Sequence, residues 1–260
     1  VYGQTGPYAK DWGIDGTGAA LSGRTCLTGW PDRDPVIPAA PFGDVIVPYV
    51  MVGAVAAALE NRHETGRGCH LDASMYEICV QQMYKAILET QQGKTPRRMG
   101  NQDTCFFHQG VYPALGVDRW IAISLATEET WHLLRDLAAL PRADDAEERD
   151  RVIAAWTRDK SDTSLVKQLQ QTGIAAGVVQ DIEDVLEADP QIEMRCTLNP
   201  IDHPLLGKFG HIRTPMHLSR SEVQMFRAPG MGEHSRRIAR DLAGLTEARI
   251  DELESLGVFQ

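Results

Sequence analysis

Two aspartates lie where helices are predicted to begin, and the first, Asp44, stands in a local sequence that suits nucleophilic chemistry. It lies between Gly43 and an apolar run, residues 45–59. Because Asp is a preferred N-cap residue, one interpretation is that Asp44 only begins a helix. The other is a carboxylate nucleophile, which can attack an activated acyl group and form a covalent intermediate. Helix N-terminal N–H groups would orient such a carboxylate or an oxyanion, and position alone leaves both interpretations open.

The second is Asp15, in the stretch Trp12-Gly-Ile-Asp-Gly16. By position alone, Asp15 is predicted to cap a short helix over residues 15–22. The glycines of residues 13–18 follow a Gly-x-x-Gly-x-Gly pattern, with no predicted strand before them. This differs from the Gly-x-Gly-x-x-Gly of dinucleotide-binding loops, so a Rossmann phosphate loop is not predicted here.

A basic group, Lys94, Arg97 and Arg98, lies in the loop-like residues 93–101. It could bind a phosphate, although a solvated basic loop is the commoner explanation. No metal site is predicted, because the two groups of possible ligands lack metal-ligand spacing. These groups are His63, Cys69 and His70, and His203, His211 and His217.

The chain of 260 residues is acidic, with 26 Lys and Arg against 36 Asp and Glu and a formal net charge of −10. This balance argues against binding to nucleic acid or an anionic membrane, but allows a local basic pocket. Five irregularly spaced cysteines do not indicate a disulfide framework, so a cytoplasmic location is expected. The apolar residues 45–59 are too few to span a bilayer, and they include Pro48. We therefore predict a buried helix here.

Helices and strands have to position these residues. Apolar spacing and turn residues predict a strand at 69–73, a long helix at 75–92, a hairpin of strands 111–113 and 120–125, and a further strand at 175–180. Helices are expected at 44–61, 127–140, 161–172, 181–188, 235–243 and 247–256, with an extended segment at 199–227. The middle third is therefore predicted to be a small α/β module between two helical parts.

Several short motifs, taken in order along nearly the whole chain, resemble family III CoA-transferases. This family includes formyl-CoA transferase, carnitine CoA-transferase and α-methylacyl-CoA racemase. Each motif alone is weak, but their order and spacing are specific. The motifs are Tyr2-Gly-Gln-x-Gly-Pro-Tyr8, Gly13-Ile-Asp15, Thr28-Gly29, residues 38–44, Glu60-Asn-Arg-His-Glu-Thr-Gly-Arg-Gly68, Leu71-Asp-Ala-Ser-Met-Tyr-Glu77, Arg98-Met-Gly-Asn101, Gly110-Val-Tyr-Pro113, Ala188-Asp-Pro-Gln191, His203-Pro-Leu-Leu-Gly207, Ala228-Pro-Gly-Met-Gly-Glu-His234, Leu245-Thr-Glu and Leu256-Gly-Val258.

The resemblance implies an α/β fold with a Rossmann-like large domain, only partly present here, and a small α/β domain. Residues 1–100 and 200–260 would belong to the large domain and residues 101–199 to the small one. Complete members form two interlocked chains. Because the chain begins at Val1 with a sequence typical of the middle of such proteins, we expect a truncated enzyme or one that needs a second subunit.

The resemblance also implies a reaction, the transfer of coenzyme A from an acyl-CoA donor to a small carboxylic acid. Asp44 matches the family's catalytic aspartate, and Asp15 matches an acidic residue that assists it. Arg97, Arg98, Gly100 and Asn101 are the expected CoA contacts. Coenzyme A is then a substrate, and no metal or permanently bound cofactor is expected. A homodimer is expected.

The resemblance leaves more than one activity open. Racemases carry a histidine base directly before the acid that Asp15 matches, and Ile14 stands there instead, which disfavours racemisation. The chain could also hydrolyse the aspartyl intermediate, or be an inactive fragment that depends on a partner. The glycine-rich loop of formyl-CoA transferase is not evident at residues 106–110, so formate and oxalate are disfavoured, and Met75-Tyr-Glu77 is nearer to the carnitine-type branch.

Overall fold

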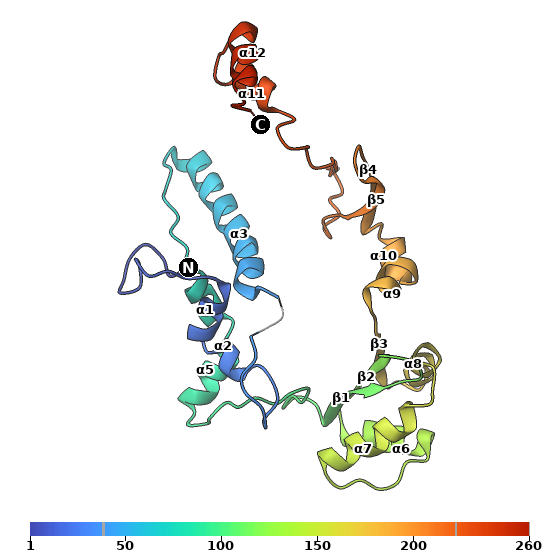
Figure 1. Cartoon of the computed structure of the whole chain (residues 1–260). Coiled ribbons are helices and arrows are strands. Elements are labelled where there is room, and N and C mark those ends of the chain that lie inside the picture. The colour runs from blue at the N-terminus through green and yellow to red at the C-terminus, as the bar shows by residue number, and fades with distance from the viewer. Residues whose placement is uncertain (38–39, 222, 260) are drawn as a thin grey trace. The chain divides into compact units, whose positions relative to one another are not determined.

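The computed structural model describes residues 1–37, 40–221 and 223–259. Residues 38 and 39 of the 38–44 motif, and Glu222 of the predicted extended segment, lie outside the described residues. The chain divides into two compact units, Val1–Val179 and Gln180–Gln260 (Figure 1). The domain boundaries expected at residues 100 and 199 differ from this division and stay a prediction.

Short helices and one long helix make up the first hundred residues. They are α1 (Asp15–Leu21), α2 (Arg24–Leu27), α3 (Phe42–Thr65), α4 (Met75–Gln81) and α5 (Tyr84–Gln91). The predicted long helix over 75–92 is wrong in one respect, because it is divided between α4 and α5. There the N–H groups of Gln82 and Met83 donate to carbonyls three residues back, a tighter turn than an α-helix. The predicted strand at residues 69–73 is also wrong, since these residues pair with no strand in the part of the chain that the structure describes.

Helix α3 is longer than the apolar run that predicted it. Its N-cap is Pro41 and its last residue is Thr65. The C-cap Gly66 has a φ of 71°, a left-handed conformation that commonly ends helices. The apolar run was expected to be too short to span a bilayer, but the helix is longer than the run. By length and composition, α3 alone among the described helices could cross a membrane, a property it shares with many core helices of soluble proteins.

Burial of this helix was predicted, and that prediction is wrong. Gly43 is its only buried residue, and Tyr49 and Val52 are 64% and 69% exposed. Helices α1 and α4 pack against α3 but leave most of its apolar side chains uncovered. Composition alone could not reveal this, because burial depends on neighbours from elsewhere in the sequence.

A three-stranded sheet forms the centre of the predicted α/β module. Its strands, β1 (His108–Pro113), β2 (Trp120–Leu125) and β3 (Ala175–Val179), follow the order β1-β2-β3 with antiparallel pairs throughout. The predicted hairpin and third strand are confirmed, with β1 beginning three residues earlier than expected. In Figure 1 the helices α6 (Glu128–Ala138), α7 (Ala146–Thr157) and α8 (Asp162–Gln171) lie around this sheet.

The module has a closed hydrophobic core. Thr127 is the N-cap of α6 and its hydroxyl accepts the N–H of Thr130, and the apolar stripe of α6 faces the sheet. Alternate residues of β2 point inward, so one face of the strand is fully buried. The core consists of Tyr112, Ile121, Ile123, Leu125, Trp131, Leu134, Ala143, Ile153, Leu165, Val166, Leu169 and Ile174.

The second unit consists of short elements. It contains α9 (Ile182–Glu187), α10 (Pro190–Met194), β4 (Leu198–His203), β5 (Gly207–Ile212), α11 (Ser235–Asp241) and α12 (Glu247–Ser255). Strands β4 and β5 form a hairpin inside the segment predicted to be extended. The Arg236 guanidinium pairs with Glu247, Asp251 and Glu254, which joins α11 to α12. The predicted α/β class is confirmed by the whole set of elements.

Candidate active site

The structure brings the two predicted catalytic aspartates together at the start of α3. Asp15 Oδ1 accepts the backbone N–H of Gly43, and that of Asp44 at 3.3 Å. These N–H groups lie in the first turn of a helix, where no intrahelical carbonyl is available to them. Asp15 therefore caps α3 from another helix, 28 and 29 residues away in the sequence.

Both capping roles predicted from position are wrong. Asp44 is the third residue of α3 and not its N-cap, which is Pro41. Asp15 is the first residue of α1, whose N-cap is Ile14. The N–H of Ile14 donates to the Thr17 hydroxyl and not to Asp15. Local sequence could not distinguish these arrangements, because a carboxylate can cap any helix terminus within its reach.

The Asp44 carboxylate is exposed and has no hydrogen-bond donor among the described residues. Its main-chain carbonyl also lacks the usual helical partner, since residue 48 is a proline without an N–H. Because α3 begins at Phe42, Pro48 lies inside the helix, beyond its first turn. The candidate nucleophile is thus open to a substrate.

Gly43 lets three elements meet beside Asp44. A Cβ at this position would lie 2.7 Å from the Met75 sulfur and 2.8 Å from Asp15 Oδ1. Both distances are well below van der Waals contact, so no larger residue fits without moving its neighbours. Met75 itself is the first residue of α4, whose N-cap Ser74 accepts the N–H of Glu77.

A cation that the sequence analysis missed lies next to this turn. The guanidinium carbon of Arg24 is 3.4 Å from the centre of the Phe42 ring, a close cation–π contact. Its Nε is buried and has no hydrogen-bond partner among the described residues. One signal was available, because Arg24 is the only charged residue between Asp15 and Asp32.

The charges around this site affect the pKa of the Cys79 thiol. Burial raises its pKa, the negative charge of Asp15 raises it further, and the positive charge of Arg24 opposes both. Cys79 is fully buried in α4 and is therefore kept in its neutral thiol form. It is a packing residue and not a nucleophile.

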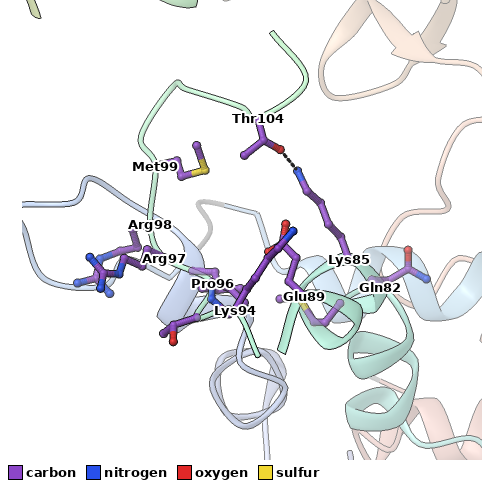
Figure 2. A pocket seen from close by; sticks show the side chains of 13 residues that line it. Gln82, Lys85, Glu89, Lys94, Pro96, Arg97, Arg98, Met99 and Thr104 are labelled. Carbon is purple, nitrogen blue, oxygen red and sulfur yellow. Dashed lines mark hydrogen bonds between the residues drawn. The ribbon is translucent and has the colours of Figure 1, made fainter. Parts of the chain in front are cut away.

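A second candidate region is a basic cavity of about 700 Å³, lined by parts of α5 and by residues 94–99 (Figure 2). Its cations are Lys85, Lys94, Arg97 and Arg98. In Figure 2, Arg97 and Arg98 lie across the view from Lys85, whose Nζ donates to the Thr104 hydroxyl at 3.1 Å. The predicted basic group therefore lines a cavity and is not only a solvated loop.

The four predicted CoA contacts do not line one cavity. Arg98 donates to the carbonyls of Cys26, at 2.8 Å, and Trp30, at 3.3 Å, and so joins its loop to α2. Gly100 has a φ of 59°, and a Cβ there would overlap the Trp30 ring. Asn101 lines a separate cavity of about 210 Å³, and its carbonyl accepts the Gln109 amide. Of the four, Arg97 is exposed and forms no hydrogen bond or ion pair with a described residue, and the CoA contacts stay a prediction.

A polar cluster in the module was also missed, in which His108 and Tyr112 are buried and the Asp150 side chain is 46% exposed. His108 Nε2 lies 2.9 Å from both the Tyr112 hydroxyl and Asp150 Oδ1, and Tyr112 donates to the same oxygen at 2.8 Å. Burial raises the Tyr112 pKa, and the Asp150 charge adds to this. The cluster joins α7 to β1.

No group of three metal ligands occurs within the described ranges, and His203 instead accepts the N–H groups of Leu205 and Leu206.

Comparison with known proteins decides the family. The family described as CoA-transferase family III matches residues 1–235. The chain belongs to this family. A succinyl-CoA–D-citramalate CoA-transferase of Chloroflexus aurantiacus is 27% identical over 99% of this chain and 67% of its own length. The β subunit of a succinyl-CoA–L-malate CoA-transferase of the same organism is 24% identical over 99% of this chain and 68% of its own length.

Solved structures agree with the sequence comparison. A CaiB/BaiF family protein from Brucella suis has a TM-score of 0.80 at 25% identity, with 93% of this chain and 66% of that chain covered. The fold of this family III member is thus the one expected from the motif order. The chain spans about two thirds of the length of each of these three proteins.

Proposed function

We propose that this family member transfers coenzyme A from an acyl-CoA donor to a carboxylic acid, with the Asp44 carboxylate as nucleophile. The observation that carries the proposal is the arrangement at α3, where Asp15 holds the main chain of Gly43 and Asp44 while the Asp44 carboxylate stays exposed and unpaired among the described residues. Family membership supplies the reaction class. Coenzyme A acts as a substrate in this scheme, which needs no resident cofactor.

The first half of the reaction activates Asp44. One carboxylate oxygen attacks the thioester carbonyl of the donor, the carbon–sulfur bond breaks, and CoA leaves as a thiolate. The product is a mixed anhydride of Asp44 and the donor acid. The thiolate then attacks the Asp44 carbonyl carbon, which releases the donor carboxylate and leaves an aspartyl-CoA thioester.

The second half runs in reverse with the acceptor. Its carboxylate attacks the aspartyl thioester, CoA thiolate leaves, and a new mixed anhydride forms. The thiolate attacks the acceptor's acyl carbon, which restores the Asp44 carboxylate and gives the acceptor CoA ester. Each thioester is exchanged for another of similar energy, so no net proton transfer or ATP is required.

Asp15 is a positioning residue in this scheme. It accepts the N–H groups of Gly43 and Asp44, and the N–H of Val45 donates to the Pro41 carbonyl at 3.0 Å. These three N–H groups are therefore not available to an oxyanion. Stabilisation of developing negative charge has to come from another group, and the adjacent cation is Arg24.

Arg24 is the group proposed to receive the acceptor carboxylate. Two carboxylates, Asp15 and Asp44, would repel an anionic acceptor, and a neighbouring guanidinium offsets this repulsion. Its stacking on Phe42 fixes the plane of the guanidinium next to the nucleophile's turn. The dicarboxylic substrates named for the two Chloroflexus relatives are compatible with a cation at this place.

Racemisation has less support. It needs a base on each face of the α-carbon, and the residue before Asp15 is Ile14, an exposed apolar side chain.

A second chain and a cytoplasmic location complete the proposal. The uncovered apolar side chains of α3 and the relative named as a β subunit support a homodimer or a second subunit. The five cysteines are all free, which supports a reducing compartment.

The test uses the purified chain, alone and with candidate partner chains, mixed with an acyl-CoA and a free acid. Hydroxylamine trapping followed by mass spectrometry should locate the adduct at Asp44. Asp44→Asn should lower transfer by roughly 10³-fold or more, while Glu60→Gln, an exposed carboxylate on the same helix, should not change it. Near-normal transfer by Asp44→Asn would exclude Asp44 as the nucleophile. CoA release without acyl exchange would indicate hydrolysis, and solvent deuterium at the α-carbon would indicate racemisation.

A further inference from the structure

A small polar cavity lies between the α/β module and the loop that follows α2. It has a volume of about 210 Å³, and its walls come from Trp30, from Asn101 and Gln102, from β1, and from Asp150 and Ala154 of α7. The proposed transfer steps involve none of these residues. Drug-sized ligands occupy cavities of roughly 300–1,000 Å³, so this one suits a smaller molecule.

The wall of this cavity carries a negative charge that its neighbours do not balance. Asp150 Oδ1 is held by His108 Nε2 and the Tyr112 hydroxyl, while Oδ2 accepts no hydrogen bond from a described residue. Asp150 also forms no ion pair with a described Lys or Arg, because the adjacent Arg149 lies over the Phe107 ring instead, 4.7 Å from its centre.

His108 does not supply the missing positive charge. Its Nδ1 is buried and has no hydrogen-bond partner among the described residues. An imidazolium would carry an N–H at Nδ1, and a buried donor without an acceptor is unfavourable. The neutral ring, with its proton on Nε2 toward Asp150, fits this geometry, so the cluster keeps the negative charge of the carboxylate.

Two glutamine amides add acceptors to the same wall. Gln102 Nε2 donates to the Gln109 carbonyl at 2.7 Å, and Gln109 Nε2 donates to the Asn101 carbonyl at 2.6 Å. Because a carbonyl only accepts, these contacts fix both amide nitrogens and leave both Oε1 atoms without a donor among the described residues. With Asp150 Oδ2, the lining residues offer three acceptor oxygens, which suits a cation and disfavours an anion such as phosphate.

Trp30 gives the cavity an aromatic side. A Cβ on Gly100 would overlap the six-membered part of the indole ring, so glycine at this position lets the main chain lie against the ring. Tryptophan is the aromatic side chain that binds cations best. The wall therefore combines a carboxylate, amide oxygens and an aromatic ring.

We propose that this cavity binds a primary alkylammonium compound. An –NH3⁺ group has three N–H donors, the number of acceptor oxygens that the lining residues leave free, and its charge balances that of Asp150. The first carbons of the alkyl chain lie against Trp30. A divalent metal ion fits less well, because the cavity offers one carboxylate and no group of three metal ligands occurs in the described part of the chain.

Saturation-transfer NMR on the full chain, which reads the signals of the ligand, tests the proposal with propylammonium. 1-Propanol has nearly the same shape without the charge, and tetramethylammonium has the charge without N–H donors. Titrations should show that propylammonium binds about tenfold or more tightly than either.

Two variants locate the binding. Asp150→Asn removes the charge but keeps an oxygen that can accept the Tyr112 hydroxyl, and it should weaken propylammonium binding about tenfold or more. Asp159→Asn, an exposed carboxylate of the same module, is the matched control and should leave binding unchanged. Trp30→Leu, outside the module's core, should weaken binding about threefold.

Two results would overturn the proposal. One is equal binding of propylammonium by Asp150→Asn and the unchanged chain, and the other is binding of 1-propanol or tetramethylammonium as tight as that of propylammonium. If hydrogen exchange shows that Asp150→Asn unfolds the module, Trp30→Leu decides, and unchanged binding there contradicts the site. Asp44→Asn should bind propylammonium normally, so loss of transfer and loss of this site are separate observations.

Discussion

The α/β module and the helical region that carries the candidate active site differ in how far they bury their apolar residues. In the module, Leu125, Leu134 and Ile153 are fully buried around a three-stranded sheet. In the helical region, Tyr49 and Val52 of α3 are mostly exposed. The module stabilises itself through its own core, whereas the candidate active site lies where packing among the described residues is open. Reactive groups that meet substrates, or further protein, need such uncovered surface.

The largest expected effect is a contrast in stability. Leu134→Ala should destabilise the module by about 2–5 kcal/mol, because it leaves a cavity in a closed core. Val52→Ala on α3 should change stability by less than about 0.5 kcal/mol in the chain alone, because Val52 is exposed. Hydrogen exchange read by mass spectrometry, with peptides from residues 108–179 and 42–65 compared, separates the two regions. A large effect of Val52→Ala would show that α3 is covered in solution.

The next effect tests packing at the site itself. Gly43→Ala should destabilise the start of α3 by about 1–3 kcal/mol, since its methyl group would overlap Met75 and Asp15. Met75→Ala should restore part of the loss, which a double-mutant cycle of unfolding free energies would measure. Additive effects of the two changes would contradict the close contact.

A smaller effect is expected at Arg24. Arg24→Gln should raise the KM for the acid acceptor about tenfold, because one charge-assisted contact is lost, with a smaller change in the KM for the acyl-CoA. Arg33→Gln, an exposed cation in the following loop, is the matched control. Equal changes in both KM values would indicate that Arg24 only supports the fold through Phe42.

The smallest effect concerns acid stability of the module. Burial would raise the pKa of Asp162, but hydrogen bonds from Arg119 and from Thr163 outweigh it and lower the pKa below its ordinary value of 3.8. A lowered pKa contributes stability above about pH 3.8, and this stability is lost as the pH falls through the folded-state value. Asp162→Asn should therefore reduce the acid sensitivity of exchange in residues 108–179. An unchanged pH profile would contradict the assignment.

Much of the module was predictable because its signals are local. Alternating residues of β2, the turn before it and the Thr127 cap each depend on a few neighbouring residues. The helical region was less predictable. The break at Gln82 and Met83 and the exposure of α3 depend on which segments pack together, and no local pattern records that.

By itself, the sequence determined the α/β class, the order of most elements, the two aspartates worth examining and the family. Apolar spacing and turn residues carry the elements, and the ordered short motifs carry the aspartates and the family. Only the tertiary structure decided that Asp15 caps α3, that Arg24 lies against Phe42, and that the expected CoA contacts are divided between different places. The physical reason is distance along the chain. Helix and strand patterns depend on neighbours a few residues away, whereas these contacts join residues far apart in the sequence, which only packing brings together.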